Sequence, residues 1–152
     1  LTLSPSLHPI QPLLEDAAAQ GAAAAAEKGI SLSVLPCAGS ARFDAKWTSE
    51  ALFNVVDNAL KYTPPGGSVT LSAERYELFC RIRVTDSGPG IPEEEQAQIF
   101  SRFYRGAAVR DQDGLGLGLY LTRRILIRQG GYLRLSSRPG QGSEFSLYLP
   151  LE

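Results

Sequence analysis

A central amphipathic helix between Lys46 and Tyr62 is the clearest element that the pattern of apolar and polar positions predicts. At about 100° per residue its apolar side chains share one broad face, made of Ala51, Leu52, Phe53, Val55, Val56, Ala59 and Leu60. This face indicates packing against a sheet. The other face is unusual, because Asn54 and Asn58 lie in register and asparagine is a middling helix former. These amides and a neighbouring carboxylate offer oxygens to a hard cation, and Lys61 offers a positive charge to a phosphate; a plain solvated face is the alternative.

Shorter periodic segments flank this helix. The Pro-rich start, through Pro12, is expected to begin as a linker, and residues 13–28 are expected to form an alanine-rich helix that Gly29 ends. Asp44 is the expected N-cap of the central helix, which the TPPGG run at 63–67 stops. Strands are expected at 30–35, 40–43, 68–75, 78–85, 132–137 and 143–149, a hairpin turn at 74–77, and helices at 92–99 and 118–128. This order predicts a two-layer α+β domain, in which a mixed, mostly antiparallel sheet carries about three helices on one face.

Composition narrows the classes of function. The chain has 152 residues, enough for one domain, and its formal net charge of −1 gives no electrostatic case for binding nucleic acid or an anionic membrane. Cys37 and Cys80 have no CxxC or histidine neighbour, so neither a disulfide framework nor a metal site is indicated. No apolar run approaches the roughly 18 residues of a membrane span. Because the chain starts at Leu1 and contains no methionine, we expect it to be a piece of a longer protein.

Two glycine-containing segments are candidates for ligand binding. Asp86 ends a predicted strand and is followed by Gly88 and Gly90; its carboxylate suits an exocyclic amine, and the glycines let a ligand approach the backbone. A simple β-turn is the alternative for this loop. The Gly-x-Gly-x-Gly run at 114–118 precedes a predicted helix, where successive N–H groups and the helix N-terminus suit phosphate. Its spacing matches neither GxGxxG nor the P-loop pattern.

Taken together, these segments resemble the catalytic ATP-binding domain of sensor histidine kinases, within the ATPase superfamily that includes gyrase and MutL. Five segments are similar to the family's N box, G1 box, F box, G2 box and final glycine box: 54–64, 86–91, 99–105, 114–119 and 140–145. Their order and separations also fit. The resemblance implies the Bergerat ATPase fold, a two-layer α/β sandwich, with residues 1–6 as a linker remnant and 7–152 as the catalytic domain.

The resemblance implies a binding site for ATP and Mg²⁺. The cofactor-binding residues would be Asn54, Asn58, Lys61, Tyr62, Asp86, Gly88, Gly90, Ile91, Phe103, Gly114, Leu115, Gly116, Leu117, Gly118, Leu119 and Ser143. The catalytic residues would be Asn54, Asn58, Lys61 and Arg105. Asn58 would bind the metal, with Asn54 assisting, and Lys61 would contact phosphate. Asp86 would hydrogen-bond the adenine amine, and Tyr62 would pack on the nucleotide.

The resemblance also gives roles to the segment between the two glycine-containing loops. Residues 104–114 would form a lid over ATP, and the backbone amides around Gly116 and Gly118 would hold phosphate. Arg105 would reach the γ-phosphate. From the residues alone, an aromatic and arginine-rich stretch such as 100–105 more often holds a loop on a core than contacts a ligand.

One position separates a kinase from a hydrolase. The gyrase branch carries a glutamate four residues before its metal-binding asparagine, where it activates water, and Glu50 precedes Asn54 by this spacing. The residues around Asn58 and Lys61 instead resemble the family's metal-binding position, so that Asn54 stands where the glutamate would be. Because an amide is not a base, this register favours a kinase over a hydrolytic ATPase.

The resemblance implies a phosphate acceptor outside this chain. The family's receiving histidine lies in a separate helical dimerisation domain, whereas the only histidine here, His8, is followed by proline. The expected partners are the dimerisation and phosphoacceptor domain of the parent protein and a downstream response regulator, with no nucleic acid and no membrane contact. The fragment is expected to be monomeric and cytoplasmic, within an inner-membrane sensor. The alternatives are a related serine kinase or ATPase, and a pseudokinase that serves as an interaction module.

Overall fold

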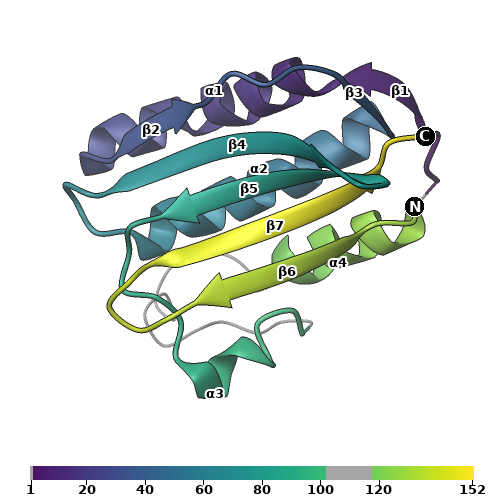
Figure 1. Ribbon diagram of the computed structural model, residues 1–152. Coiled ribbons are helices and arrows are strands. Elements are labelled where there is room, and N and C mark those ends of the chain that lie inside the picture. Colours follow the sequence, from purple (N-terminus) through teal and green to yellow (C-terminus); the bar gives the residue numbers. More distant parts are fainter. Residues whose placement is uncertain (1, 102–117) are drawn as a thin grey trace.

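Over residues 2–101 and 118–152, which the computed structural model describes, a five-stranded sheet carries helices on one face, and a two-stranded sheet lies at one end of it (Figure 1). The elements are β1 (Ser6–Pro9), α1 (Ile10–Lys28), β2 (Ser31–Val34), β3 (Ser40–Phe43), α2 (Ala45–Tyr62), β4 (Ser68–Tyr76), β5 (Phe79–Asp86), α3 (Glu93–Gln96), α4 (Gly118–Arg128), β6 (Tyr132–Ser137) and β7 (Ser143–Pro150). The helices α1, α2 and α4 lie behind the larger sheet. This arrangement confirms the predicted two-layer α+β fold.

The larger sheet has the strand order β2–β4–β5–β7–β6. Strand β2 runs parallel to β4 and the other neighbours are antiparallel, which confirms the predicted mixed, mostly antiparallel sheet. Successive side chains on a strand point to opposite faces, and those that face the helices, such as Ile82, Val84 and Leu147, are fully buried. The apolar face of α2 completes this core, and of the residues expected on that face only Phe53 is partly exposed.

Helix α2 begins and ends where the sequence predicts. The side chain of Asp44 accepts a hydrogen bond of 2.8 Å from the N–H of Trp47, which confirms it as the N-cap. The helix ends at Tyr62, because Pro64 and Pro65 have no N–H to extend the hydrogen-bond ladder. Neither α2 nor any other helix within residues 2–101 and 118–152 is long and apolar enough to cross a membrane.

The N-terminal segment forms more regular structure than the sequence predicted. Residues 6–9 form β1, which pairs antiparallel with β3 where a linker was expected. Helix α1 then begins at Ile10, not at residue 13, so Pro12 lies in its first turn. Proline is tolerated there, since the first turn of a helix has no intrahelical partner for the missing N–H. Proline therefore marked the start of this helix and not a break before it.

The hairpin between β4 and β5 is tighter than predicted. Strand β4 continues to Tyr76 and β5 begins at Phe79, so the turn consists of Glu77 and Leu78 alone. Glu77 has φ +56°, a left-handed conformation that is uncommon for a residue with a side chain. Leu78, predicted as an inward-facing strand residue, is 78% exposed in this turn. Helix α3 is also shorter than the predicted 92–99.

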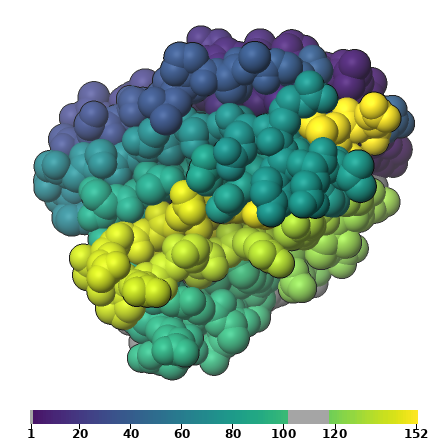
Figure 2. Space-filling view, in the orientation of Figure 1, coloured from purple at the N-terminus to yellow at the C-terminus, as the bar shows by residue number. Residues whose placement is uncertain are grey.

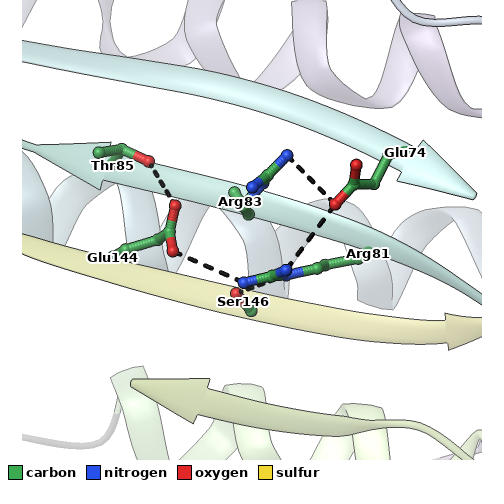
Figure 3. A network of polar contacts seen from close by, with 6 residues as sticks. All are labelled: Glu74, Arg81, Arg83, Thr85, Glu144 and Ser146. Carbon is green, nitrogen blue, oxygen red and sulfur yellow. Dashed lines mark hydrogen bonds and ion pairs between the residues drawn. The ribbon is translucent and has the colours of Figure 1, made fainter. Parts of the chain in front are cut away.

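The face of the sheet away from the helices carries a network of charges across three strands (Figure 3). Arg81 on β5 lies 3.7 Å from Glu74 on β4 and 3.6 Å from Glu144 on β7. Arg83 lies 3.2 Å from the same oxygen of Glu74. Side chains of β4, β5, β6 and β7 cover this side of the molecule (Figure 2). Because each exposed ion pair contributes little, the network mainly disfavours pairings of these strands in another register.

Candidate nucleotide-binding site

A buried carboxyl group, that of Asp86, lies where β5 ends and β7 begins. Asp86 pairs with Ser143 across the two strands, and it is 7% exposed. Its Oδ1 accepts hydrogen bonds from the N–H groups of Gly88, at 2.9 Å, and Ser143, at 3.3 Å. Within the described part of the chain no group donates to Oδ2. The backbone therefore fixes one carboxyl oxygen and leaves the other for a ligand.

The electrostatics of Asp86 indicate a role beyond folding. Burial raises the pKa of Asp86 above its ordinary value of 3.8, and the hydrogen bonds from Gly88 and Ser143 offset only part of that rise. The bond from Gly88 is also the bond of an Asx turn, so the turn role considered from the sequence is present. A turn alone does not require a buried carboxyl group, and perturbed pKa values gather at functional sites.

Glycines permit the close packing around this carboxyl group. A Cβ atom on Gly88 would lie 3.0 Å from Asp86 Oδ1 and 3.3 Å from the carbonyl oxygen of Tyr62. Gly90 has φ +78° and Gly142 has φ +80°, where L side chains are strained. A Cβ atom at either position would also run into a backbone carbonyl group of a neighbouring segment. The loop after β5 thus lies directly against the end of α2 and the start of β7.

The polar face of α2 lies beside the start of α4. Asn54 and Asn58 are both half-buried, and Asn54 Nδ2 donates a long hydrogen bond of 3.4 Å to the carbonyl oxygen of Gly118. Lys61 forms an ion pair of 3.1 Å with Asp57, one turn earlier on α2. That pair is exposed and therefore weak, so Lys61 can exchange it for another anion. The amide oxygens of Asn54 and Asn58 are hard donors of the kind that Mg²⁺ accepts beside water and phosphate.

The other predicted site residues divide into three groups. Ser143 is 6% exposed and lies beside Asp86, and Tyr62 is half-buried with its carbonyl oxygen near Gly88. Ile91 is 4% exposed and lies in the hydrophobic core, and the partly buried Leu119 packs against that core. The remaining predicted residues lie outside the described ranges: Phe103, Arg105, Gly114, Leu115, Gly116 and Leu117.

Sequence reasoning missed the polar residues that hold the loop after β5. Ser137 Oγ accepts a hydrogen bond of 2.7 Å from the N–H of Ile91 and lies 2.8 Å from Ser143 Oγ. Gln96 Nε2 donates to the carbonyl oxygens of Ile91, at 2.8 Å, and Ser137, at 3.1 Å. Thr63 is fully buried, and its Oγ1 has no hydrogen-bond partner among the residues that the structure describes. The one signal in the sequence was a serine at position 137, on the side of the strand that otherwise carries Leu133 and Leu135.

Comparison with known proteins identifies the family. A family model described as histidine kinase-, DNA gyrase B-, and HSP90-like ATPase matches residues 43–152. The chain belongs to this ATPase family. The matched range contains every described residue of the predicted site, from Asn54 on α2 to Ser143 on β7. The family that the sequence motifs resemble is therefore confirmed.

Individual relatives place the chain among the histidine kinases of this ATPase family. Sensor protein DivL of Caulobacter vibrioides is 46% identical over 112 residues, which are 74% of this chain and 14% of DivL. The solved mycobacterial sensor histidine kinase MprB has a TM-score of 0.84 at 27% identity, covering 95% of this chain and 97% of that one. Full-length ShkA, solved in complex with AMPPNP, has a TM-score of 0.86 at 31% identity, covering 99% of this chain and 32% of ShkA.

These likenesses support an ATP-binding catalytic domain of the histidine kinase type. The chain spans less than a third of the length of curated relatives such as DivL and the Synechococcus sensory kinase SasA. The activities of those whole proteins are therefore only proposed for this chain.

Proposed function

We propose that this domain binds Mg·ATP and transfers the γ-phosphate to a histidine on a separate dimerisation domain of the parent protein, as a sensor histidine kinase does. The observation that carries the proposal is the buried Asp86, which keeps one carboxyl oxygen unused within the described chain. It lies against the same end of α2 that carries Lys61 and Tyr62. One end of the fold thus offers an acceptor for an amine next to groups suited to phosphate.

Asp86 would bind the adenine end of the nucleotide. Its Oδ2 accepts a hydrogen bond from the exocyclic amine, while Oδ1 stays fixed by the N–H groups of Gly88 and Ser143. Gly88 and Gly90 would shape the site by letting the loop after β5 lie close to the backbone of neighbouring segments, and Ile91 anchors this loop in the core. Tyr62 packs on the nucleotide. The two hydrogen bonds to Oδ1 hold this carboxyl group in place before a ligand binds, which limits the ordering that binding requires.

The polar face of α2 would bind the phosphates. Asn58, with Asn54 assisting, supplies oxygens to Mg²⁺, which when bound neutralises charge that develops on the phosphates. Lys61 leaves Asp57 and contacts a phosphate oxygen. The backbone amides around Gly116 and Gly118, and the side chain of Arg105, complete the binding of phosphate. No base is available at Asn54 to activate water, so transfer to a positioned histidine is favoured over hydrolysis.

His8 is poorly suited to be the phosphate acceptor. It lies in β1, its ring packs against Phe43 at a centroid distance of 5.1 Å, and Nε2 lies 2.9 Å from Ser6 Oγ. Strand β1 and the end of β5 lie at opposite ends of the molecule (Figure 1). This supports an acceptor on the dimerisation domain. The proposal also includes a response regulator downstream and a parent protein that is a sensor of the inner membrane. The domain itself would be monomeric and cytoplasmic.

Calorimetric titration with a non-hydrolysable ATP analogue tests the proposal. The wild-type domain should bind with micromolar affinity in the presence of Mg²⁺ and more weakly without it, and Asp86→Asn and Asn58→Asp should each weaken binding at least tenfold. Asp16→Asn, an exposed change on α1, is the matched control and should leave binding unchanged. An absence of binding by the wild type would refute the proposal and favour the interaction module.

Phosphate transfer needs a separate experiment. The dimerisation domain of the parent protein is supplied in trans with labelled ATP, and its histidine should become phosphorylated. Binding of nucleotide without transfer would identify a pseudokinase, and transfer to serine would identify the related serine kinase.

A further inference from the structure

The end of α2 leaves two carbonyl groups that its own backbone cannot satisfy. In an α-helix the carbonyl of each residue accepts a hydrogen bond from the N–H four residues later. For Leu60 and Lys61 those later residues are Pro64 and Pro65, which have no N–H. The double proline that stops the helix therefore guarantees two orphan acceptors in its last turn, just where Lys61 and Tyr62 lie.

Lys28 donates to both of these carbonyl groups. Its Nζ lies 2.8 Å from the carbonyl oxygen of Leu60 and 2.9 Å from that of Lys61. Lys28 is the last residue of α1 and is half-buried, and it forms no ion pair with a carboxylate of the described chain. An ammonium group at this position also opposes the partial negative charge at the C-terminus of α2. One side chain thus replaces the two hydrogen bonds that the prolines remove.

Backbone hydrogen bonds join the same two segments. The N–H of Gly66 donates to the carbonyl oxygen of Gly29 at 2.8 Å, and the N–H of Ser31 donates to that of Gly67 at 3.0 Å. The loop after α2 is therefore attached to the end of α1 and the start of β2. Lys28 lies directly before this attachment and extends it into the last turn of the helix.

The turn that Lys28 holds forms one side of the nucleotide site. The carbonyl oxygen of Tyr62 lies 3.3 Å from where a Cβ atom on Gly88 would stand, and Gly88 donates the hydrogen bond that fixes Asp86 Oδ1. We propose that Lys28 is a positioning residue, which fixes the last turn of α2 so that Lys61, Tyr62 and the Asp86 loop face the nucleotide together. This inference rests on the proposed ATP-binding function.

Four variants test the role of Lys28 by titration with the ATP analogue, ADP and Mg²⁺. Lys28→Met keeps most of the aliphatic chain but has no donor, and it should bind both nucleotides about tenfold more weakly. Lys28→Arg keeps the donors and should stay within about threefold of wild type. Asp44→Ala removes the cap at the other end of α2, and it should lower stability while leaving affinity within about twofold. Lys28→Gln, one atom shorter, replaces Lys28→Met if that variant does not fold.

Stability measurements in denaturant separate a positioning role from a general loss of structure. If Lys28→Met loses no more affinity than Asp44→Ala at a similar loss of stability, or binds like wild type, the inference is overturned while the proposed function stands. If the wild type binds no nucleotide, both fail. With the acceptor domain present, Lys28→Met should raise KM for ATP and leave kcat within about twofold, because Lys28 touches no reacting atom.

Discussion

Replacing Gly142 by alanine should be far more damaging than the same change at Gly140, although both glycines lie in the loop between β6 and β7. Their φ angles are +80° and +82°, so the conformational penalty of a side chain is nearly equal at the two positions. Their surroundings differ. A Cβ atom on Gly140 would have no neighbour within 4 Å, whereas one on Gly142 would overlap the backbone carbonyl group of Asp86.

Two contributions set the expected losses of stability: the conformational cost of a side chain at positive φ, and the overlap of the added Cβ atom with neighbouring atoms. An L residue in the left-handed region costs about 1–2 kcal/mol, which is the whole effect expected for Gly140→Ala. At Gly142 the added Cβ atom would come well inside the 3.0 Å that real Cβ contacts keep, and its neighbour is backbone, not a flexible side chain. Overpacking of this kind adds about 1–3 kcal/mol. Gly142→Ala should therefore lower the free energy of unfolding by about 2–5 kcal/mol.

The variant should also weaken nucleotide binding, because the overlap separates the start of β7 from Asp86. The N–H of Ser143 already donates to Asp86 Oδ1 at a long distance of 3.3 Å, and further separation would break this bond. Urea unfolding measures the first effect, and calorimetric titration with the ATP analogue measures the second. Equal losses of stability for the two alanine variants would contradict this prediction, since the conformational cost would then account for the whole effect.

Three further changes test other parts of the structure. Burial raises the pKa of Asp86 above 3.8, so this group stabilises the folded wild type at low pH, and that stabilisation is lost as pH rises through the raised pKa. Asp86→Asn should therefore have a higher urea unfolding midpoint than wild type at pH 7. The difference between the two midpoints should shrink as pH falls towards 3.8. Thr122→Val should lower the free energy of unfolding by about 1 kcal/mol, because the buried Thr122 Oγ1 donates a hydrogen bond of 3.0 Å to the carbonyl oxygen of Ala51. Equal unfolding midpoints for wild type and variant would contradict this. Burial raises the pKa of Cys80 to about 12 and also raises that of Cys37, so a thiol reagent at pH 8 should label Cys80 only as the protein unfolds; rapid labelling of two thiols would refute this.

The sequence predicts the elements of this fold well where the periodicity is long or a local signal is strong. Helix α2 has a continuous apolar face, a capping Asp44 and a double-proline stop, and each appears in the structure. The N-terminal segment was predicted less well, because the β1 strand at 6–9 is stabilised by pairing with β3 some 30 residues later, and no local pattern encodes that contact. A hairpin turn was predicted at 74–77, but its restriction to Glu77 and Leu78 was not, because glutamate rarely adopts positive φ.

Single motifs in the sequence identify individual residues of the proposed site, but not the contacts between distant segments that surround them. The motif after β5 identifies Asp86, but the burial of that carboxyl group depends on strands brought together from distant parts of the chain. The two orphan carbonyl groups before Pro64 and Pro65 follow from the sequence alone, whereas their partner does not. Lys28 stands more than 30 residues earlier and ends a different helix, so only the packing of α1 on α2 reveals what it does.

Two features that weaken the folded state lie beside the proposed site: the buried carboxyl group of Asp86, and Oγ1 of Thr63, which has no hydrogen-bond partner among the described residues. Natural proteins tolerate such features where function needs them. A ligand that uses Asp86 should therefore stabilise wild type more than Asp86→Asn. Without nucleotide at pH 7 the neutral variant is the more stable of the two. Nucleotide at 100 times the wild-type Kd adds about 2.7 kcal/mol to wild type and about 1.4 kcal/mol to a variant that binds tenfold more weakly. If this concentration stabilises both proteins equally, Asp86 has no share in binding the nucleotide.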